Sequence, residues 1–197
     1  MLAMILFLNC TKTTAQAPAA PAPQASNPST AEVQQLTLIL QITAVRCGDK
    51  TKERAKQVFD AVRAFRLKEN RFPQSVDDLK DHSLSPGKAS IPPANPFADP
   101  TLVSKELRQE LINSGHEPSP LCKIIIESDP YVSAGFPLTL HHVKLKPDNL
   151  EPGTIVVKYN ADYYLAVWCS GFTGKPIEDE KTHLPFLLFE DFSNLSH

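Results

Sequence analysis

The stretch TKERAKQVFDAVRAFRLKENRFPQSVDDL, residues 51–79, decides the fold of this 197-residue chain. Its first part, 51–68, places apolar side chains at the i, i+3, i+4, i+7 spacing of an amphipathic helix. The apolar positions are Ala55, Val58, Phe59, Val62 and Phe65, and charged residues stand between them. A helix with one apolar stripe must bury that stripe, so we expect it to lie on a sheet.

The second part of this stretch ends the helix and redirects the chain. Asn70 follows the last helical residues, and asparagine can adopt the left-handed conformation that stops a helix. Phe72 precedes Pro73 and is therefore pushed out of helical geometry. Ser75 is predicted to begin a short second helix in which Leu79 faces inward. We predict that Asn70, Phe72, Pro73 and Leu79 form a structural junction.

A second apolar segment, EVQQLTLILQITAVRC at 32–47, precedes this helix. Thr37, Gln41 and Thr43 interrupt it, and it is too short and too polar for a membrane span of about 20 apolar residues. We interpret it as a helix that is largely covered by protein. Together with the amphipathic part it predicts one long helix over 31–69.

The chain changes from helical to strand-like character further on. A proline-rich loop at 84–100 and a third helix at 102–113 are followed by runs rich in β-branched and aromatic residues. These runs predict strands at 121–128, 135–145, 153–160, 162–170 and 184–190, with a hairpin at Asn160-Ala161-Asp162. Helices first and strands later predict an α+β domain: a long N-terminal helix packed on a small antiparallel β-sheet.

This order of elements resembles the type IV pilins and the pseudopilins of type II secretion. In that family a long helix is followed by a segment of the form N-G-x-(Tyr/Phe)-Pro-x-x-x-x-x-Leu. Phe72, Pro73 and Leu79 match its positions, and Asn70 stands where the family has glycine. NPFADP at 95–100 and GTIVVKYNADYYLAVWCSGFTGKPI at 153–177 resemble the family's turn and last hairpin.

The family's Gly-Phe-x-x-x-Glu processing site and its run of about 20 apolar residues are not found in this sequence. The resemblance therefore implies a pilin-like globular domain, either displayed from a lipid or exported freely. It also implies a protein that is not an enzyme and that acts through protein–protein contacts in a type II secretion or type IV pilus-type assembly.

The N-terminal residues predict export to the bacterial cell envelope. Residues 1–15 are apolar like a signal or lipoprotein-type leader, 16–30 form a Pro/Ala-rich linker, and 31–197 form the domain. Three interpretations of the leader remain: lipidation at Cys10, cleavage at Ala15-Gln16-Ala17, or an uncleaved cytosolic N-terminus. Membrane contact is expected only through this N-terminal anchor.

Few other residues are candidates for a site. Cys122 and Cys169 lie in strand-like runs, and they either form a disulfide or remain buried free thiols. Strand alternation places Tyr164 and Trp168 on one face of the sheet. That face is either an interaction surface or is covered by a further layer, such as the 102–113 helix or the C-terminal tail.

The net charge bears on which kinds of partner the protein can bind. The net charge of −2 argues against nucleic acid, and the expected partners are other envelope or assembly proteins. No catalytic, cofactor or metal motif is found. His141 and His142 are neighbours on a predicted strand and point to opposite faces, so they cannot both bind one metal ion.

The alternative function is a small secreted hydrolase or ligand-binding domain that uses the 84–120 loops as a pocket wall.

Overall fold

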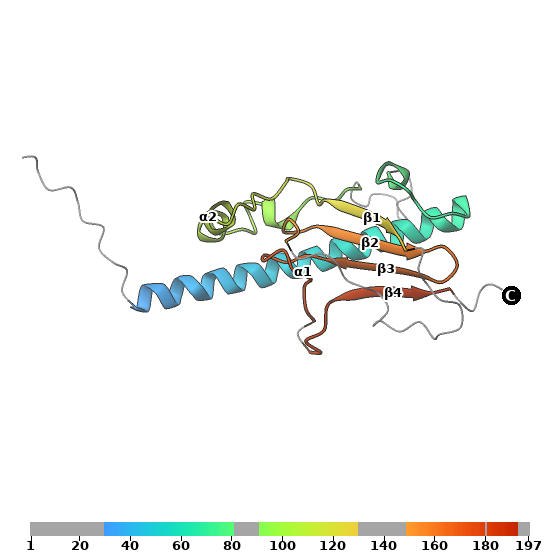
Figure 1. The fold of residues 1–197 in the computed structure, drawn as a ribbon. Coiled ribbons are helices and arrows are strands. Elements are labelled where there is room, and N and C mark those ends of the chain that lie inside the picture. Colours follow the sequence, from blue (N-terminus) through green and yellow to red (C-terminus); the bar gives the residue numbers. More distant parts are fainter. Residues whose placement is uncertain (1–29, 81–90, 130–148, 180, 193–197) are drawn as a thin grey trace, which may run out of the picture.

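The computed structural model describes residues 30–80, 91–129, 149–179 and 181–192. Two α-helices, α1 (Thr30–Glu69) and α2 (Lys105–Asn113), come before the sheet. Between them lie the 3-10 helices η1 (Asp77–Leu79) and η2 (Pro96–Ala98). The strands are β1 (Ile124–Ser128), β2 (Ile155–Asn160), β3 (Tyr164–Cys169) and β4 (Leu187–Asp191). The fold is α+β, with one long helix lying along one face of a four-stranded sheet (Figure 1).

Helix α1 runs without interruption for 40 residues, which corresponds to about 60 Å. This confirms the prediction of a single long helix over 31–69. Its buried residues form one stripe with helical spacing: Thr43, Cys47, Gly48, Thr51, Ala55, Val58, Ala61, Val62 and Phe65. Because the stripe stays on one side, the C-terminal half of α1 covers the sheet while its charged residues face solvent.

The main core lies between α1 and the sheet. The helix contributes Val58, Val62 and Phe65, and the sheet contributes alternate residues of β2 and β3 such as Val157 and Val167, which are paired across the two strands. Each of these side chains is buried. At about 1.5–3 kcal/mol for each fully buried aliphatic or aromatic side chain, this interface is the largest source of stability that the fold provides.

The sheet is mixed, with strand order β1-β2-β3-β4, and this corrects the predicted antiparallel sheet. β2, β3 and β4 are antiparallel neighbours, as expected, but β1 is parallel to β2, with Ile124 opposite Ile155. A parallel pair requires a long crossover, and the chain between Ser128 and Ile155 is long enough to supply one. The predicted strand at 135–145 falls in the part of this connection outside the described residues.

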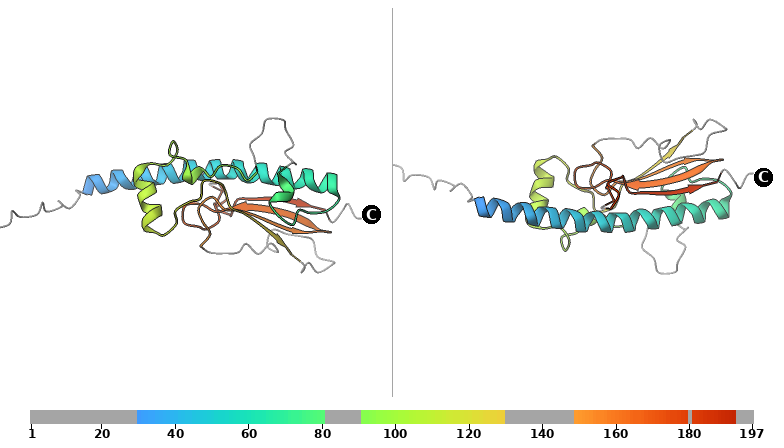
Figure 2. Two further views of the ribbon diagram at one scale, coloured as in Figure 1. Left: turned by 90° about the horizontal axis from the view of Figure 1, so that it is seen from above. Right: turned by 90° about the horizontal axis from the view of Figure 1, so that it is seen from below.

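The third predicted helix is confirmed as α2. It begins at Lys105 because Ser104 is its N-cap, with the Ser104 Oγ accepting the N–H of Leu107 at 3.2 Å. Leu107 and Leu111 pack with Cys47 of α1 and Phe97 of η2 in a second small core. Helix α2 therefore packs against the N-terminal half of α1 and does not cover the sheet, as Figure 2 shows.

The predicted junction is confirmed at its main residues. Asn70 has φ of 52°, and its N–H donates to the Arg66 carbonyl at 2.9 Å, which closes the last turn of α1. The Phe72 ring is buried and stacks on Tyr159 of β2, with ring centroids 4.4 Å apart. Pro73 and Leu79 are buried as well. The junction thus fixes the end of α1 to the tip of the β2–β3 hairpin.

The predicted helix at Ser75 is wrong in its detail. Only Asp77–Leu79 form a single 3-10 turn, and Val76 at its start offers no side-chain cap. The Asp78 carboxylate accepts the N–H groups of Gln74 and Ser75 at 2.8 and 3.2 Å. These side-chain bonds give the N–H groups of Gln74 and Ser75 acceptors in a turn, so no regular helix is needed there. The same bonds lower the pKa of Asp78.

Two substitutions at Asn70 test whether its left-handed backbone conformation, and not its side-chain contacts, is what stabilises the end of α1. Asn70→Gly should leave the free energy of unfolding nearly unchanged, because glycine adopts positive φ without strain. Asn70→Ala should lower it by about 1 kcal/mol, because a side chain with a Cβ is disfavoured in the left-handed region. Urea denaturation of both variants measures this difference. Equal stability of the two would show that α1 does not stop through a left-handed residue.

Candidate functional site

The N-terminal part of α1 carries the most apolar exposed surface among the described residues. We call residues 33–45 the free segment. Its exposed side chains are Val33, Leu36, Leu38, Ile39, Ile42 and Val45, each between 38% and 56% accessible. Figure 2 shows the first turns of α1 extending beyond the sheet and beyond α2. The prediction that this segment is largely covered by protein is therefore wrong.

The residue types of the free segment suit it to contact another apolar surface. It holds no charged residue, and its polar members are glutamine and threonine. Within the part of the chain that the structure describes, no helix is long and apolar enough to cross a membrane. Contiguous exposed apolar surface on a protein is typical of a site of contact with another protein or with a membrane surface. The free segment therefore has the composition of a surface on which another apolar surface packs.

The free segment is held in place at its C-terminal end. Leu40 is half-buried and packs against the small core of Cys47, Phe97, Leu107 and Leu111. Cys47 Sγ also donates to the Pro96 carbonyl at 3.6 Å. This core fixes the direction in which α1 leaves the domain, so the exposed apolar residues are presented by a positioned helix.

A groove continues the apolar surface toward the sheet. It has a volume of about 360 Å³ and lies between α1 and the loop 171–178, with Val45, Phe172 and Ile177 among its lining residues. Gly48 also lines it, and a Cβ at this position would come within van der Waals contact of Ile177, at 3.8 Å. Val45 belongs both to the free segment and to this groove, so the two surfaces are continuous.

Of the two alternatives for Tyr164 and Trp168, the structure supports a covered face and contradicts an interaction surface. Both side chains are only 1% exposed. Trp168 packs with Leu150, Val156, Ile125 and Leu187 on the sheet face opposite α1. Alternation placed both residues on one face correctly, but the side chains on that face are buried in further core clusters. Helix α2, one of the two layers suggested for it, packs against α1 instead.

A polar network anchors Tyr164. Its hydroxyl donates to Asp129 Oδ2 at 2.7 Å, and Lys158 Nζ lies 3.3 Å from the same oxygen. The Asn160 side-chain amide donates to the Asp129 carbonyl at 2.7 Å. Burial, followed by the neighbouring Asp129 carboxylate, raises the pKa of Tyr164. These contacts connect the end of β1 to the β2–β3 hairpin. No sequence motif predicted them.

Of the two alternatives for Cys122 and Cys169, the structure has the buried free thiols and not the disulfide. Both are free thiols in the main core, and Cys47 is a free thiol in the core beneath α2. Burial raises the pKa of Cys47 to about 11 and those of Cys122 and Cys169 to about 12. A thiol with so high a pKa is a poor nucleophile, so these cysteines serve as small apolar core residues.

Part of the loop region that was predicted as a pocket wall forms a groove. It has a volume of about 390 Å³, and its lining includes Pro100, Pro118 and Pro120. Its charged side chains are Arg108 and Glu117. Among the described residues, no three His, Cys, Asp or Glu side chains gather closely enough to hold a metal ion.

Several predicted features lie outside the described residues. These are the leader with Cys10, the linker at 16–29 and the pair His141-His142. Comparison of the chain with protein-family models, with curated proteins and with solved structures returned no match.

Proposed function

We propose that this protein is a non-enzymatic, exported, pilin- or pseudopilin-like protein of the bacterial cell envelope. It acts through protein–protein contacts in a type II secretion or type IV pilus-type assembly. The observation that carries the proposal is the free segment, a positioned helix with six exposed apolar side chains and no charge. The long helix on a sheet and the Asn70–Leu79 junction add support, since both match the elements on which the resemblance rests.

The partner surface is an apolar helix of an assembly protein, either another copy or a related chain. Helix-to-helix packing buries apolar residues at i, i+3 and i+4 spacing, and Leu38, Ile42 and Val45 have that spacing on the side of α1 away from the small core. Each such side chain contributes about 25 cal/mol per Å² of apolar surface that the contact removes from water.

The double variant Leu38→Gln/Ile42→Gln tests this contact. In detergent extracts of the envelope fraction, the wild-type chain is expected to sediment in a complex larger than its monomer. The double variant is expected to sediment as a monomer, because two glutamines replace apolar contact surface with groups that must be desolvated. Sedimentation velocity of the tagged protein measures both.

Leu184→Gln is the matched control, because Leu184 is equally exposed but lies far from α1 in the sequence, in the loop before β4. It should sediment as the wild type does. The unfolding free energy of all three proteins should agree within about 0.5 kcal/mol, since the replaced side chains are on the surface. A wild-type chain recovered from the cytosol, or found only as a monomer, would contradict the proposal.

A further inference from the structure

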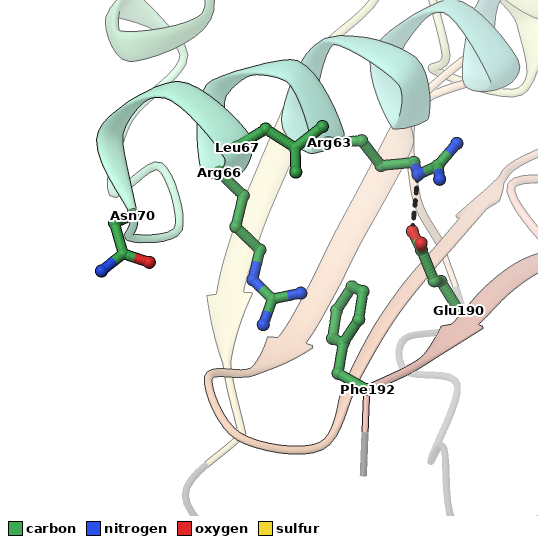
Figure 3. Close-up of a pocket in the computed structure, with 6 residues that line it drawn as sticks. All are labelled: Arg63, Arg66, Leu67, Asn70, Glu190 and Phe192. Carbon is green, nitrogen blue, oxygen red and sulfur yellow. Dashed lines mark ion pairs between the residues drawn. The ribbon is translucent and has the colours of Figure 1, made fainter. Parts of the chain in front are cut away.

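A pocket lies at the other end of α1 from the free segment. It has a volume of about 280 Å³ and is formed where the last turns of α1 meet the end of β4 (Figure 3). Arg63, Arg66, Leu67 and Asn70 line it from the helix side, and Glu190 and Phe192 line it from the strand side. The sequence offered no sign of this pocket, because its two walls are more than a hundred residues apart in the chain.

Arg66 is held in the pocket by aromatic rings. Its guanidinium carbon lies 3.5 Å from the centroid of the Phe192 ring and 4.9 Å from that of Phe72. Phe72 and Phe192 are both buried, and their centroids are 6.0 Å apart. Stacking occupies the flat face of a guanidinium and leaves the N–H groups at its edge for another partner. The rings therefore orient Arg66 without satisfying its donors.

The other cations near the pocket already have carboxylate partners. Arg63 Nε lies 2.6 Å from Glu190 Oε2, and Arg71 pairs with Asp78 at 3.4 Å. Arg66 has no carboxylate within ion-pair distance in the described part of the chain. The charges that line the pocket thus sum to one positive charge, that of Arg66.

Burial lowers the pKa of Arg66, although the carboxylates of Glu190 and Asp162 act in the opposite direction. A partly buried cation with no carboxylate within ion-pair distance is stabilised when an anion binds. The geometry of the stacked guanidinium and this charge balance point to the same missing partner, an anion with two acceptor atoms.

We propose that this pocket binds a carboxylate of a partner peptide, with Arg66 as its bidentate donor. Leu67 and Phe192, which line the pocket beside Arg66, offer apolar contact to the residue that bears the carboxylate. The singly charged carboxylate is favoured over phosphate because the pocket is at the C-terminus of a helix. The negative end of the helix dipole there disfavours anions in proportion to their charge, so a doubly charged phosphate is disfavoured more than a carboxylate.

Peptide titration of the full-length protein tests the proposal. The probes are three short peptides: acetyl-Gly-Ser-Ala-Leu with a free terminal carboxylate, the same peptide as its amide, and an amidated peptide with an internal glutamate. The NMR signal of the Arg66 Nε–H group reports binding at the site. We expect saturable binding of a carboxylate peptide and none of the neutral amide. The two carboxylate peptides show whether a chain terminus or an acidic side chain is preferred.

Variants then assign the binding to Arg66. Arg66→Gln should weaken the affinity at least about tenfold, in line with the loss of a charged hydrogen-bonding pair. Arg66→Lys should also weaken it, because an ammonium lacks the planar fork. Arg108→Gln, in α2, is the matched control and should bind as the wild type does. Equal binding of the neutral amide by the wild type, no saturable binding, or an unchanged affinity in folded Arg66→Gln would overturn the proposal.

Discussion

Trp168→Ala is expected to lower the free energy of unfolding by about 3–5 kcal/mol, the range for removal of a large aromatic side chain from a core. Trp168 is buried on the sheet face opposite α1, where it lies across from Val156 on β2 and Leu187 on β4. Alanine would leave a cavity among strands that backbone hydrogen bonds hold at a fixed distance. The surrounding side chains can fill only part of that cavity.

The measurement is urea denaturation followed by circular dichroism. Trp168→Phe is the matched control and should lose much less stability, because the smaller aromatic ring fills most of the site. A loss below about 1 kcal/mol for Trp168→Ala would show that this face of the sheet is exposed in solution. In that case the original hypothesis of an interaction surface at Tyr164 and Trp168 would stand again.

Gly153→Ala is expected to lower the free energy of unfolding by about 3 kcal/mol. Gly153 has φ of +82°, and a Cβ there would lie 2.8 Å from Asn95 Cγ. The Asn95 side chain is buried and makes two hydrogen bonds of 3.0 Å, as acceptor from Phe97 N–H and as donor to the Pro152 carbonyl. The alanine would strain the backbone and also displace a buried, hydrogen-bonded amide.

Gly115→Ala separates these two costs. Gly115 also has positive φ, at +75°, but a Cβ there would meet no atom within 4 Å. It should therefore lose only about 1 kcal/mol, the backbone cost alone. In an Asn95→Ala background, the effect of Gly153→Ala should fall to the same value. If Gly153→Ala costs no more than Gly115→Ala in the native background, the contact between Asn95 and Gly153 does not exist in solution.

Local patterns predicted the helical half of the fold well. The apolar stripe from Ala55 to Phe65 identified the buried face of α1, and Asn70 with Phe72-Pro73 identified where it ends. These features depend on residues close in the sequence. The parallel pairing of β1 with β2 did not follow from the sequence, because strand propensity does not say which neighbour a strand will choose or in which direction.

Exposure was the hardest property to predict. The apolar residues of the free segment were interpreted as covered, yet they are exposed. The sequence left open whether the face with Trp168 is exposed or covered, and the structure shows that it is buried. Whether an apolar side chain is buried depends on whether distant parts of the chain reach it. The Arg66 pocket was missed for the same reason, since Phe72 and Phe192, which hold Arg66, come from segments far apart in the sequence.

Cysteine accessibility along α1 tests the central claim, that the free segment is a contact surface, most directly. The variants Leu38→Cys and Ile42→Cys would be treated with a maleimide, once as purified protein and once in intact envelopes. Modification would be read at each residue by peptide mass. Cys47, Cys122 and Cys169 are buried and should not react, and Leu184→Cys serves as the exposed control. We predict that positions 38 and 42 react in the purified protein and are protected in the envelope, while position 184 reacts in both. Equal reactivity of positions 38 and 42 in both preparations would contradict the proposed contact.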